Sequence, residues 1–217
     1  MNSKEFPVES ENILFQPWVG SNYNESIFGI PILIVGESNY ADPKDLEHLK
    51  PHDTFTHRLI ESIIDGSWKH NFFSNIQRTF VEKPYNPVSR KEFWSSVAHC
   101  EYIQDWLLRP GISPTEDMWK KAAPIFKDVV EQLNPKCILF TGKGVFHRAS
   151  AGLSISNLAV DEIFAPTYQN PHSSVKINGA LASWVYHPAA FGGLGHYKRA
   201  RVVANPLVKA VGGTPLI

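Results

Sequence analysis

Ile30-Pro31-Ile32-Leu33-Ile34-Val35-Gly36 is an apolar run that ends at a glycine. A continuous apolar run of this length, rich in β-branched side chains, is typical of a strand that is buried on both faces of a sheet. Such strands occur in parallel sheets, whose two faces are covered by helices. The run therefore predicts the central strand of an α/β protein.

Amphipathic helices are expected on both sides of this run. The polar stretch 39–52 reads as a loop, and the next helix is expected to begin at Asp53, which can cap it, and to stop at Gly66. A shorter helix is expected from Ser89 to Val97. The strongest helical pattern opens with Ser113-Pro114-Thr115-Glu116, whose Ser-x-x-Glu spacing predicts a capping box. Its apolar positions recur every three or four residues: Trp119, Ala122, Ala123, Phe126, Val129, Val130 and Leu133.

Two more strands are expected, at residues 137–140 and 183–186. A helix is expected to start within 145–150, and another over 198–211, which Pro206 would break or shorten. The alternation of strands and helices predicts a three-layer α/β/α fold with a short, mostly parallel central sheet. In such sheets ligands bind beyond the carboxyl ends of the strands.

Length and composition predict one globular domain over residues 1–217. The chain is 43% hydrophobic and 19% charged, as in an ordinary globular protein. Residues 1–29 are expected to form a lead-in segment that docks on the domain through Phe15, Trp18 and Tyr23.

Cysteine content and hydropathy restrict the class of protein. Cys100 and Cys137 are the only cysteines and have no CxxC spacing, which argues against a disulfide framework, a zinc site or an iron–sulfur cluster. Residues 1–11 lack the apolar core of a signal peptide, and no apolar run approaches the length that spans a bilayer. We therefore expect a cytoplasmic monomer with no membrane partner, no metal and no cofactor.

Charge is balanced over the whole chain but not along it. The sequence has 21 basic and 21 acidic residues, and none of the acidic ones follows Glu162. The basic residues after that point are Lys176, Lys198, Arg199, Arg201 and Lys209. A basic C-terminal face suits local contact with nucleic-acid phosphates, although a solvated surface would have the same composition.

Two motifs follow predicted strands. Gly36-Glu37-Ser38-Asn39-Tyr40 follows the first strand and Tyr186-His187-Pro188-Ala189-Ala190 follows the last, with a helix that ends in Leu133-Asn134-Pro135 between them. This order resembles the uracil-DNA glycosylase superfamily over residues 30–203. The first motif of that family is a Gly-x-Asp-Pro-Tyr, Gly-x-Asn-Pro-Gly or Gly-Glu-x-Pro-Gly turn, and the second is His-Pro-Ser or similar. The resemblance implies a hydrolase of DNA repair that releases a base from DNA.

The resemblance implies two catalytic residues. Glu37 matches the acid that orients the attacking water, and His187 matches the histidine that donates to the developing anion on the base. A carboxylate near the sugar also stabilises the oxocarbenium-like transition state of N-glycosidic cleavage. Each residue alone could be structural, with Glu37 capping a backbone turn and His187 held by hydrogen bonds.

The resemblance also implies a base pocket. Phe55 lies where the family has an aromatic residue that stacks on the flipped base, and such stacking stabilises binding by about 1–3 kcal/mol. Tyr40 matches the tyrosine that shapes the pocket, and Ser38 is assigned to the same pocket. Glu101 lies where the family has the asparagine that reads uracil.

A phosphate-binding segment is expected after the second motif, where family members insert a loop into the DNA groove. Its members in this chain are His196, Lys198, Arg199 and Arg201. The alternative is that residues 198–201 form a solvated helix face.

Three departures from the family pattern predict a divergent branch. Asn39 replaces the motif-one proline, and the iron–sulfur cysteines of the Gly-Glu-x-Pro-Gly branch are absent. An ionised Glu101 only accepts hydrogen bonds, whereas the edge of uracil needs both a donor and an acceptor. A base with an exocyclic amine and a ring N–H suits Glu101 better. An alignment shifted by a residue or two would bring Gln104 into the pocket instead.

Two other functions remain open from sequence. The first is a binding protein of the same fold without catalysis, which Asn39 and Glu101 favour. The second is a serine-dependent esterase that uses Ser38 and His187, although Tyr40 takes the place of the last glycine in the Gly-x-Ser-x-Gly elbow.

Overall fold

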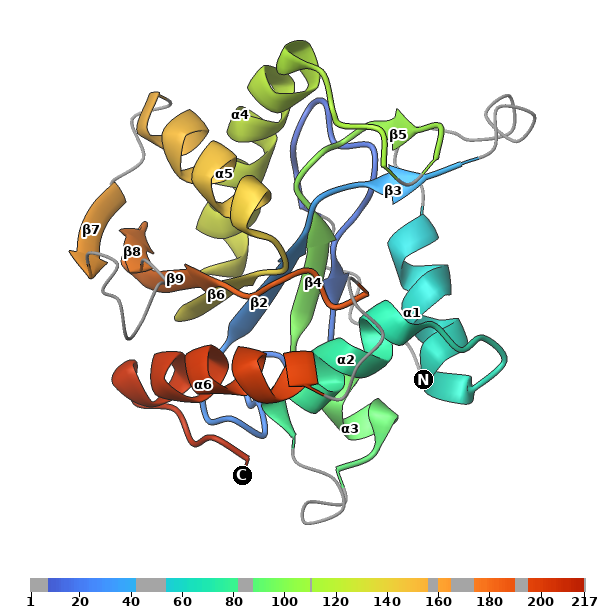
Figure 1. The fold of residues 1–217 in the computed structure, drawn as a ribbon, viewed down its shortest axis with the longest axis vertical. Helices are drawn as coiled ribbons and strands as arrows, with labels where there is room; N and C mark the ends of the chain where they lie inside the picture. Colours follow the sequence, from blue (N-terminus) through green and yellow to red (C-terminus); the bar gives the residue numbers. More distant parts are fainter. Residues whose placement is uncertain are drawn as a thin grey trace.

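A seven-stranded sheet with helices on both faces forms the body of the molecule (Figure 1). The structure is a computed structural model that describes residues 8–41, 54–81, 88–109, 111–155, 160–164, 174–189 and 195–216. Only the backbone is described for residues 154–155, 160–164 and 195–199.

The parallel part of the sheet consists of four strands in the order β4 (Ala98–Glu101), β2 (Ile32–Gly36), β6 (Cys137–Phe140) and β9 (Ala180–Trp184). Antiparallel strands flank this part: β1 (Trp18–Val19) pairs with β4, and β8 (Ser174–Ile177) and β7 (Val160–Phe164) extend the sheet beyond β9. A separate pair is formed by β3 (Asn39–Tyr40) and β5 (Trp106–Leu107).

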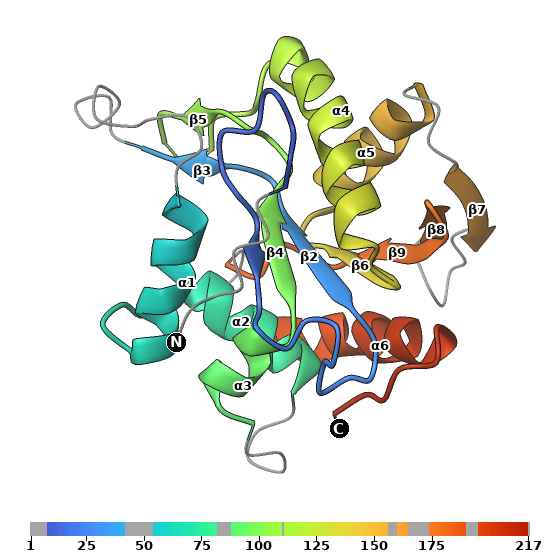
Figure 2. The same ribbon diagram turned by 180° about the vertical axis from the view of Figure 1, so that it is seen from behind.

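Helices cover the two faces of the sheet. One face bears α4 (Glu116–Leu133) and α5 (Lys143–Ile155), and the other bears α1 (Phe55–Asp65), α2 (Asn71–Phe80), α3 (Arg90–Ser95) and α6 (Gly195–Ala210), as Figures 1 and 2 show from opposite sides.

Alternation along β2 explains why both faces need cover. Successive side chains of a strand point to opposite faces. Leu33 and Val35 therefore join the core under α4 and α5, while Ile32 and Ile34 join the core under the other four helices. The predicted α/β fold with a mostly parallel central sheet is confirmed.

The order of the parallel strands creates a switch point. The chain runs from β2 to β4 on one side of it and then to β6 on the other side. Ligands of open α/β sheets bind in the crevice outside the carboxyl ends at such a reversal. The residues that follow β2, β4 and β6 therefore meet at one edge of the sheet.

Helix ends agree with the sequence at some positions and differ at others. Gly66 ends α1 in the left-handed region, at φ 82°, and Asn134 ends α4 at φ 44°. The cap of α4 is Thr115, whose hydroxyl accepts the Met118 N–H at 3.3 Å, so the prediction of a Ser113 cap was two residues early. Asp53 lies outside the described residues, and Thr54 precedes α1.

Other boundaries also differ from expectation. The helix expected over 89–97 ends at Ser95, and a strand follows at once over 98–101. The last parallel strand ends at Trp184 and not at Tyr186. Helix α6 continues through Pro206, because a proline removes one backbone hydrogen bond while the buried residues on either side keep the helix packed: Ala204, Leu207 and Val208.

The lead-in segment docks as predicted. Phe15, Trp18 and Tyr23 are buried, and the Trp18 indole N–H donates to the Trp94 carbonyl at 2.7 Å. Part of this segment is β1, a strand that the sequence analysis did not predict. Among the described helices, none has both the length and the hydropathy needed to cross a bilayer.

Candidate functional site

A cavity of about 410 Å³ lies beyond the carboxyl ends of the parallel strands. Each strand supplies part of its wall: Glu37 after β2, Glu101 at the end of β4, Thr141 and Gly142 after β6, and His187 after β9. A second wall comes from α1, α2 and the segment between them, and it is mostly aromatic or apolar: Phe55, Leu59, Trp68, His70, Phe72 and Phe73. Ser38, Asn39 and Tyr40 after β2, and Val145 of α5, complete the lining. The volume is within the usual range for small-molecule sites.

The structure brings together all residues that the sequence assigned to catalysis and base binding. Those that line the cavity are Glu37, Ser38, Tyr40, Phe55, Glu101 and His187. They are widely separated in the sequence, and the topology of the sheet explains their meeting.

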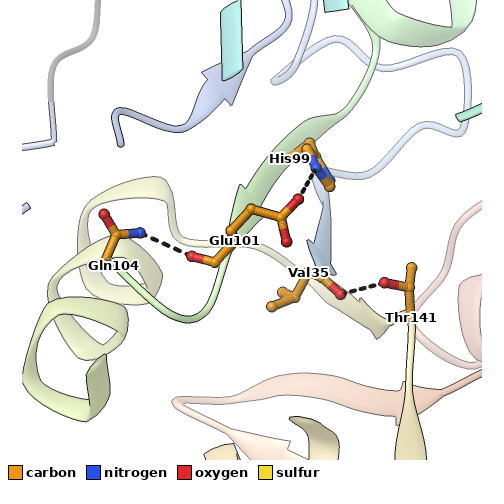
Figure 3. A network of polar contacts seen from close by, with 5 residues as sticks. All are labelled: Val35, His99, Glu101, Gln104 and Thr141. Atoms are coloured by element: carbon orange, nitrogen blue, oxygen red, sulfur yellow. Dashed lines mark hydrogen bonds and ion pairs between the residues drawn. The ribbon is translucent and has the colours of Figure 1, made fainter. Parts of the chain in front are cut away.

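Glu101 is held by the neighbouring strand and by its own. In the parallel register Gly36 lies opposite Glu101, and a Cβ atom at Gly36 would overlap the Glu101 carboxylate. Residues two apart in a strand share a face, so His99 lies beside Glu101, with Nε2 3.2 Å from Oε1 (Figure 3). Glu101 is 7% exposed, and these contacts fix the direction of its carboxylate.

Aromatic rings enclose His99. Its ring centroid lies 6.3 Å from that of Phe72, 5.7 Å from that of Phe73 and 6.1 Å from that of Trp94. Its Nδ1 atom has no hydrogen-bond partner in the described part of the chain. An imidazole whose proton is on Nε2 satisfies the Glu101 contact and leaves only an acceptor unpaired.

The Gln104 side chain forms hydrogen bonds with backbone groups and does not line the cavity. Its amide nitrogen donates to the Glu101 carbonyl at 2.9 Å (Figure 3), and its amide oxygen accepts from the Leu14 and Phe15 N–H groups at 3.0 and 2.8 Å. It therefore joins the turn after β4 to the lead-in segment. Of the two candidate positions, Glu101 is the one that faces the cavity.

Glu37 is less constrained than Glu101. Burial, and then the charge of Glu101, raise the pKa of the Glu37 carboxyl above its ordinary value of 4.5. No hydrogen bond joins this carboxyl to another described residue, whereas its backbone carbonyl accepts the Ile103 N–H at 2.9 Å. The Glu37 carboxyl, which lines the cavity, is therefore available to a molecule bound there and can exchange a proton with it.

His187 is set up as a neutral hydrogen-bond donor. Its Nδ1 accepts the Ala189 N–H at 3.3 Å, so the proton of the neutral ring is on Nε2. Burial, and then the electrostatic effect of the nearby His70, lower the pKa of His187 below its ordinary value of 6.5. The next residue is fixed because Asn75 donates its amide N–H to the Pro188 carbonyl at 2.7 Å.

Two polar groups on the cavity wall have no partner among the described residues. The Ser38 hydroxyl and the Asn39 amide nitrogen belong to side chains that are only 8% and 6% exposed. The Thr141 hydroxyl, by contrast, is engaged with the Val35 carbonyl at 3.0 Å (Figure 3). Buried polar groups without partners are costly, so a ligand that pairs with them gains affinity. The Ser38–His187 contact that an esterase needs is not formed.

The aromatic wall contains residues that the sequence reading missed. Phe55 lines the cavity while its ring packs edge-on against Trp106 at 4.7 Å. Trp68 and His70 stack at 4.8 Å with a 25° angle between their rings. Neither they, nor Phe72, nor His99 were predicted. The spacing of Phe72, Phe73, Ile76 and Phe80 is that of an amphipathic helix and was the available signal for α2.

The phosphate-binding residues are the least supported part of the prediction. The side chains of His196, Lys198 and Arg199 lie outside the described part of the structure. Arg201 is 9% exposed and donates to the Arg78 carbonyl at 2.9 Å. Its guanidinium joins α6 to α2. The assignment of Arg201 to phosphate binding stays a prediction.

No protein-family model matches the chain, and no curated protein matches it. In the described part of the structure, no three His, Cys, Asp or Glu side chains are grouped as metal ligands would be. The chemistry of the cavity is therefore the main guide to function.

Proposed function

We propose that the protein is an N-glycosylase with a uracil-DNA glycosylase-like fold, which hydrolyses the bond between a base and its deoxyribose in DNA. One observation is the main support. An acid with a raised pKa, Glu37, and a neutral imidazole, His187, line the same cavity as an aromatic wall. The two residues come from the motifs that resemble that family.

The aromatic wall suits a flipped base. A nucleobase is flat and apolar on its faces, and its stacking on aromatic rings stabilises binding by about 1–3 kcal/mol per base. Enzymes that act on a base take it out of the duplex into such a pocket. Phe55 from α1 and Phe72 from α2 are candidates for this role, since both line the cavity.

The reaction needs a water molecule and no change of oxidation state. The C1′–N bond breaks and its electron pair goes to the base, while the water oxygen forms a bond to C1′. Ionised Glu37 orients this water and accepts its proton. The Nε2–H of His187 donates a hydrogen bond to the base as negative charge develops there. Solvent then protonates the released base. In this proposal the protein acts in DNA repair as a cytoplasmic monomer.

Base release from oligonucleotides tests the proposal. Single- and double-stranded substrates that carry uracil, hypoxanthine or modified guanine would be incubated with the wild type, Glu37→Gln and His187→Ala. We expect release by the wild type and a loss of roughly 100-fold or more in each variant, which is the usual contribution of a general base for Glu37 and of a donor to a developing anion for His187. Glu116→Gln is the matched control, because Glu116 is an exposed carboxylate that pairs with Arg148 at the surface.

The outcomes separate the candidate functions. If the wild type binds these substrates but releases no base from any of them, the catalytic proposal is wrong and the binding-protein alternative stands. If Glu37→Gln is as active as the wild type, base release depends on another acid.

A further inference from the structure

One wall of the cavity carries a carboxylate, whose oxygens are hydrogen-bond acceptors. Glu101 presents a carboxylate at the carboxyl end of β4, and carboxylate oxygens have about four acceptor positions in all. The His99 contact occupies one position on Oε1. Oε2 is the atom nearest to the place that a Gly36 Cβ would take. A ligand in the cavity can use the acceptor positions that these two contacts leave.

The direction of this carboxylate is set on two sides. His99 fixes Oε1, and the absence of a side chain at Gly36 lets the carboxylate lie against the backbone of β2. Because both partners belong to adjacent central strands, the group has little freedom to rotate toward a poorly matched ligand. A carboxylate whose direction is fixed can discriminate between ligands by the positions of their hydrogen-bond donors.

Few bases present two adjacent donors. Guanine has a ring N–H beside an exocyclic amine, and both can donate to one carboxylate. Uracil has a single ring N–H between two carbonyls, and adenine and cytosine have an amine beside a bare ring nitrogen. A carboxylate opposite any of these three places one of its oxygens against an acceptor, which is repulsive.

The unpartnered groups complete the match. Guanine also has a carbonyl oxygen next to its ring N–H, and this oxygen needs a donor. The Asn39 amide nitrogen and the Ser38 hydroxyl are buried donors, without partners among the described residues, and both residues line the same cavity. A guanine edge would therefore engage Glu101 and one of these donors together.

We infer that the cavity recognises a guanine-type base, one with a ring N–H beside an exocyclic amine, through the carboxylate of Glu101. This inference rests on the proposed function, because it names the base that the glycosylase would release. The substrate would be a modified guanine that retains this edge.

Binding of free bases tests the inference without any need for turnover. Ligand-observed NMR titration would compare 9-methylguanine with 9-methylhypoxanthine, which lacks the amine, and with 9-methyladenine and 1-methyluracil. For the wild type we expect 9-methylguanine to bind roughly 10- to 100-fold tighter than the other three, as for a bidentate contact.

The Glu101→Gln variant sharpens the test. Glutamine keeps an acceptor for His99 but replaces one carboxylate oxygen with a donor, so it suits a ring N–H beside a carbonyl, as in hypoxanthine and uracil. We expect its preference for 9-methylguanine to disappear or reverse, while Glu116→Gln binds like the wild type. A ratio of affinities within one variant does not depend on the fraction of protein that is folded.

The results distinguish this inference from the proposed function. Equal binding of the four bases by the wild type, or an unchanged preference in Glu101→Gln, overturns the inference whether or not the protein releases a base. Guanine preference without release from any oligonucleotide supports the inference and removes the catalytic proposal.

Discussion

The carboxyl ends of β2 and β4 lie side by side, and each supplies one carboxylate to the cavity. Glu101, at the end of β4, is fixed by His99 and fits against Gly36. Glu37, just after β2, has no side-chain hydrogen bond to another described residue, and burial and Glu101 raise its pKa. Two acids in one pocket with different surroundings are suited to different tasks. The fixed one can recognise a ligand, and the other can move a proton.

The pH dependence of base release is the largest effect expected from this difference. Release requires ionised Glu37, whose pKa is raised above 4.5, and neutral His187, whose pKa is lowered below 6.5. The rate should be level near neutral pH, should fall about tenfold per pH unit between the two pKa values, and should fall more steeply below both. Measurement of kcat/KM from about pH 4 to about pH 8 checks this.

Glu101→Gln sharpens the same profile. Removing the Glu101 charge removes one cause of the raised pKa of Glu37. The decrease in rate that protonation of Glu37 causes should therefore occur at a lower pH in this variant than in the wild type. For the wild type, a rate that falls from about pH 6 to about pH 8 would contradict the expected profile, because His187 would then act in its protonated form.

Gly36→Ala should disrupt the end of β4 more than the end of β2. The new Cβ atom overlaps the Glu101 carboxylate, and overpacking of a core typically costs about 1–3 kcal/mol of folding free energy. The free energies of unfolding in urea of the wild type, Gly36→Ala, Glu101→Ala and the double variant form a double-mutant cycle. The double variant should lose less free energy of unfolding than the sum of the two single losses, since Glu101→Ala removes the carboxylate that the new Cβ atom overlaps. Additive losses would place the strain of Gly36→Ala elsewhere.

The smallest effect concerns the stability of Glu37→Gln. The pKa of Glu37 is higher in the folded than in the unfolded protein, so protonation of Glu37 stabilises the fold. This contribution to the free energy of unfolding is fully present below pH 4.5 and is lost as the pH rises through the folded-state pKa. Glutamine has no charge to desolvate. The free energy of unfolding of Glu37→Gln should therefore exceed that of the wild type at neutral pH and match it near pH 4.5. A difference that does not change with pH would contradict the desolvation of Glu37.

The parts predicted from sequence are those with a strong local pattern. The apolar runs of β2 and β6 and the periodicity of α4 identified the sheet and one of its covering helices. Glu37 and His187 could be proposed because each lies just beyond a strand, where α/β proteins place their sites.

The parts that were missed depend on tertiary contacts. Ala98-His99-Cys100-Glu101 contains two polar residues in a buried strand, and this is stable because His99 and Glu101 pair with each other and lie against aromatic rings and Gly36. Nothing in the local sequence shows that pairing. Arg201 similarly looked like a surface cation, although its guanidinium is directed to a carbonyl of α2.

A crystal structure with 9-methylguanine bound tests the central claim most directly. We expect the purine ring inside the cavity against the aromatic wall, with its ring N–H and amine within hydrogen-bond distance of Glu101 and its N9 side toward Glu37 and His187. A ring bound outside the cavity, or inside it with Glu101 unengaged, would contradict the account.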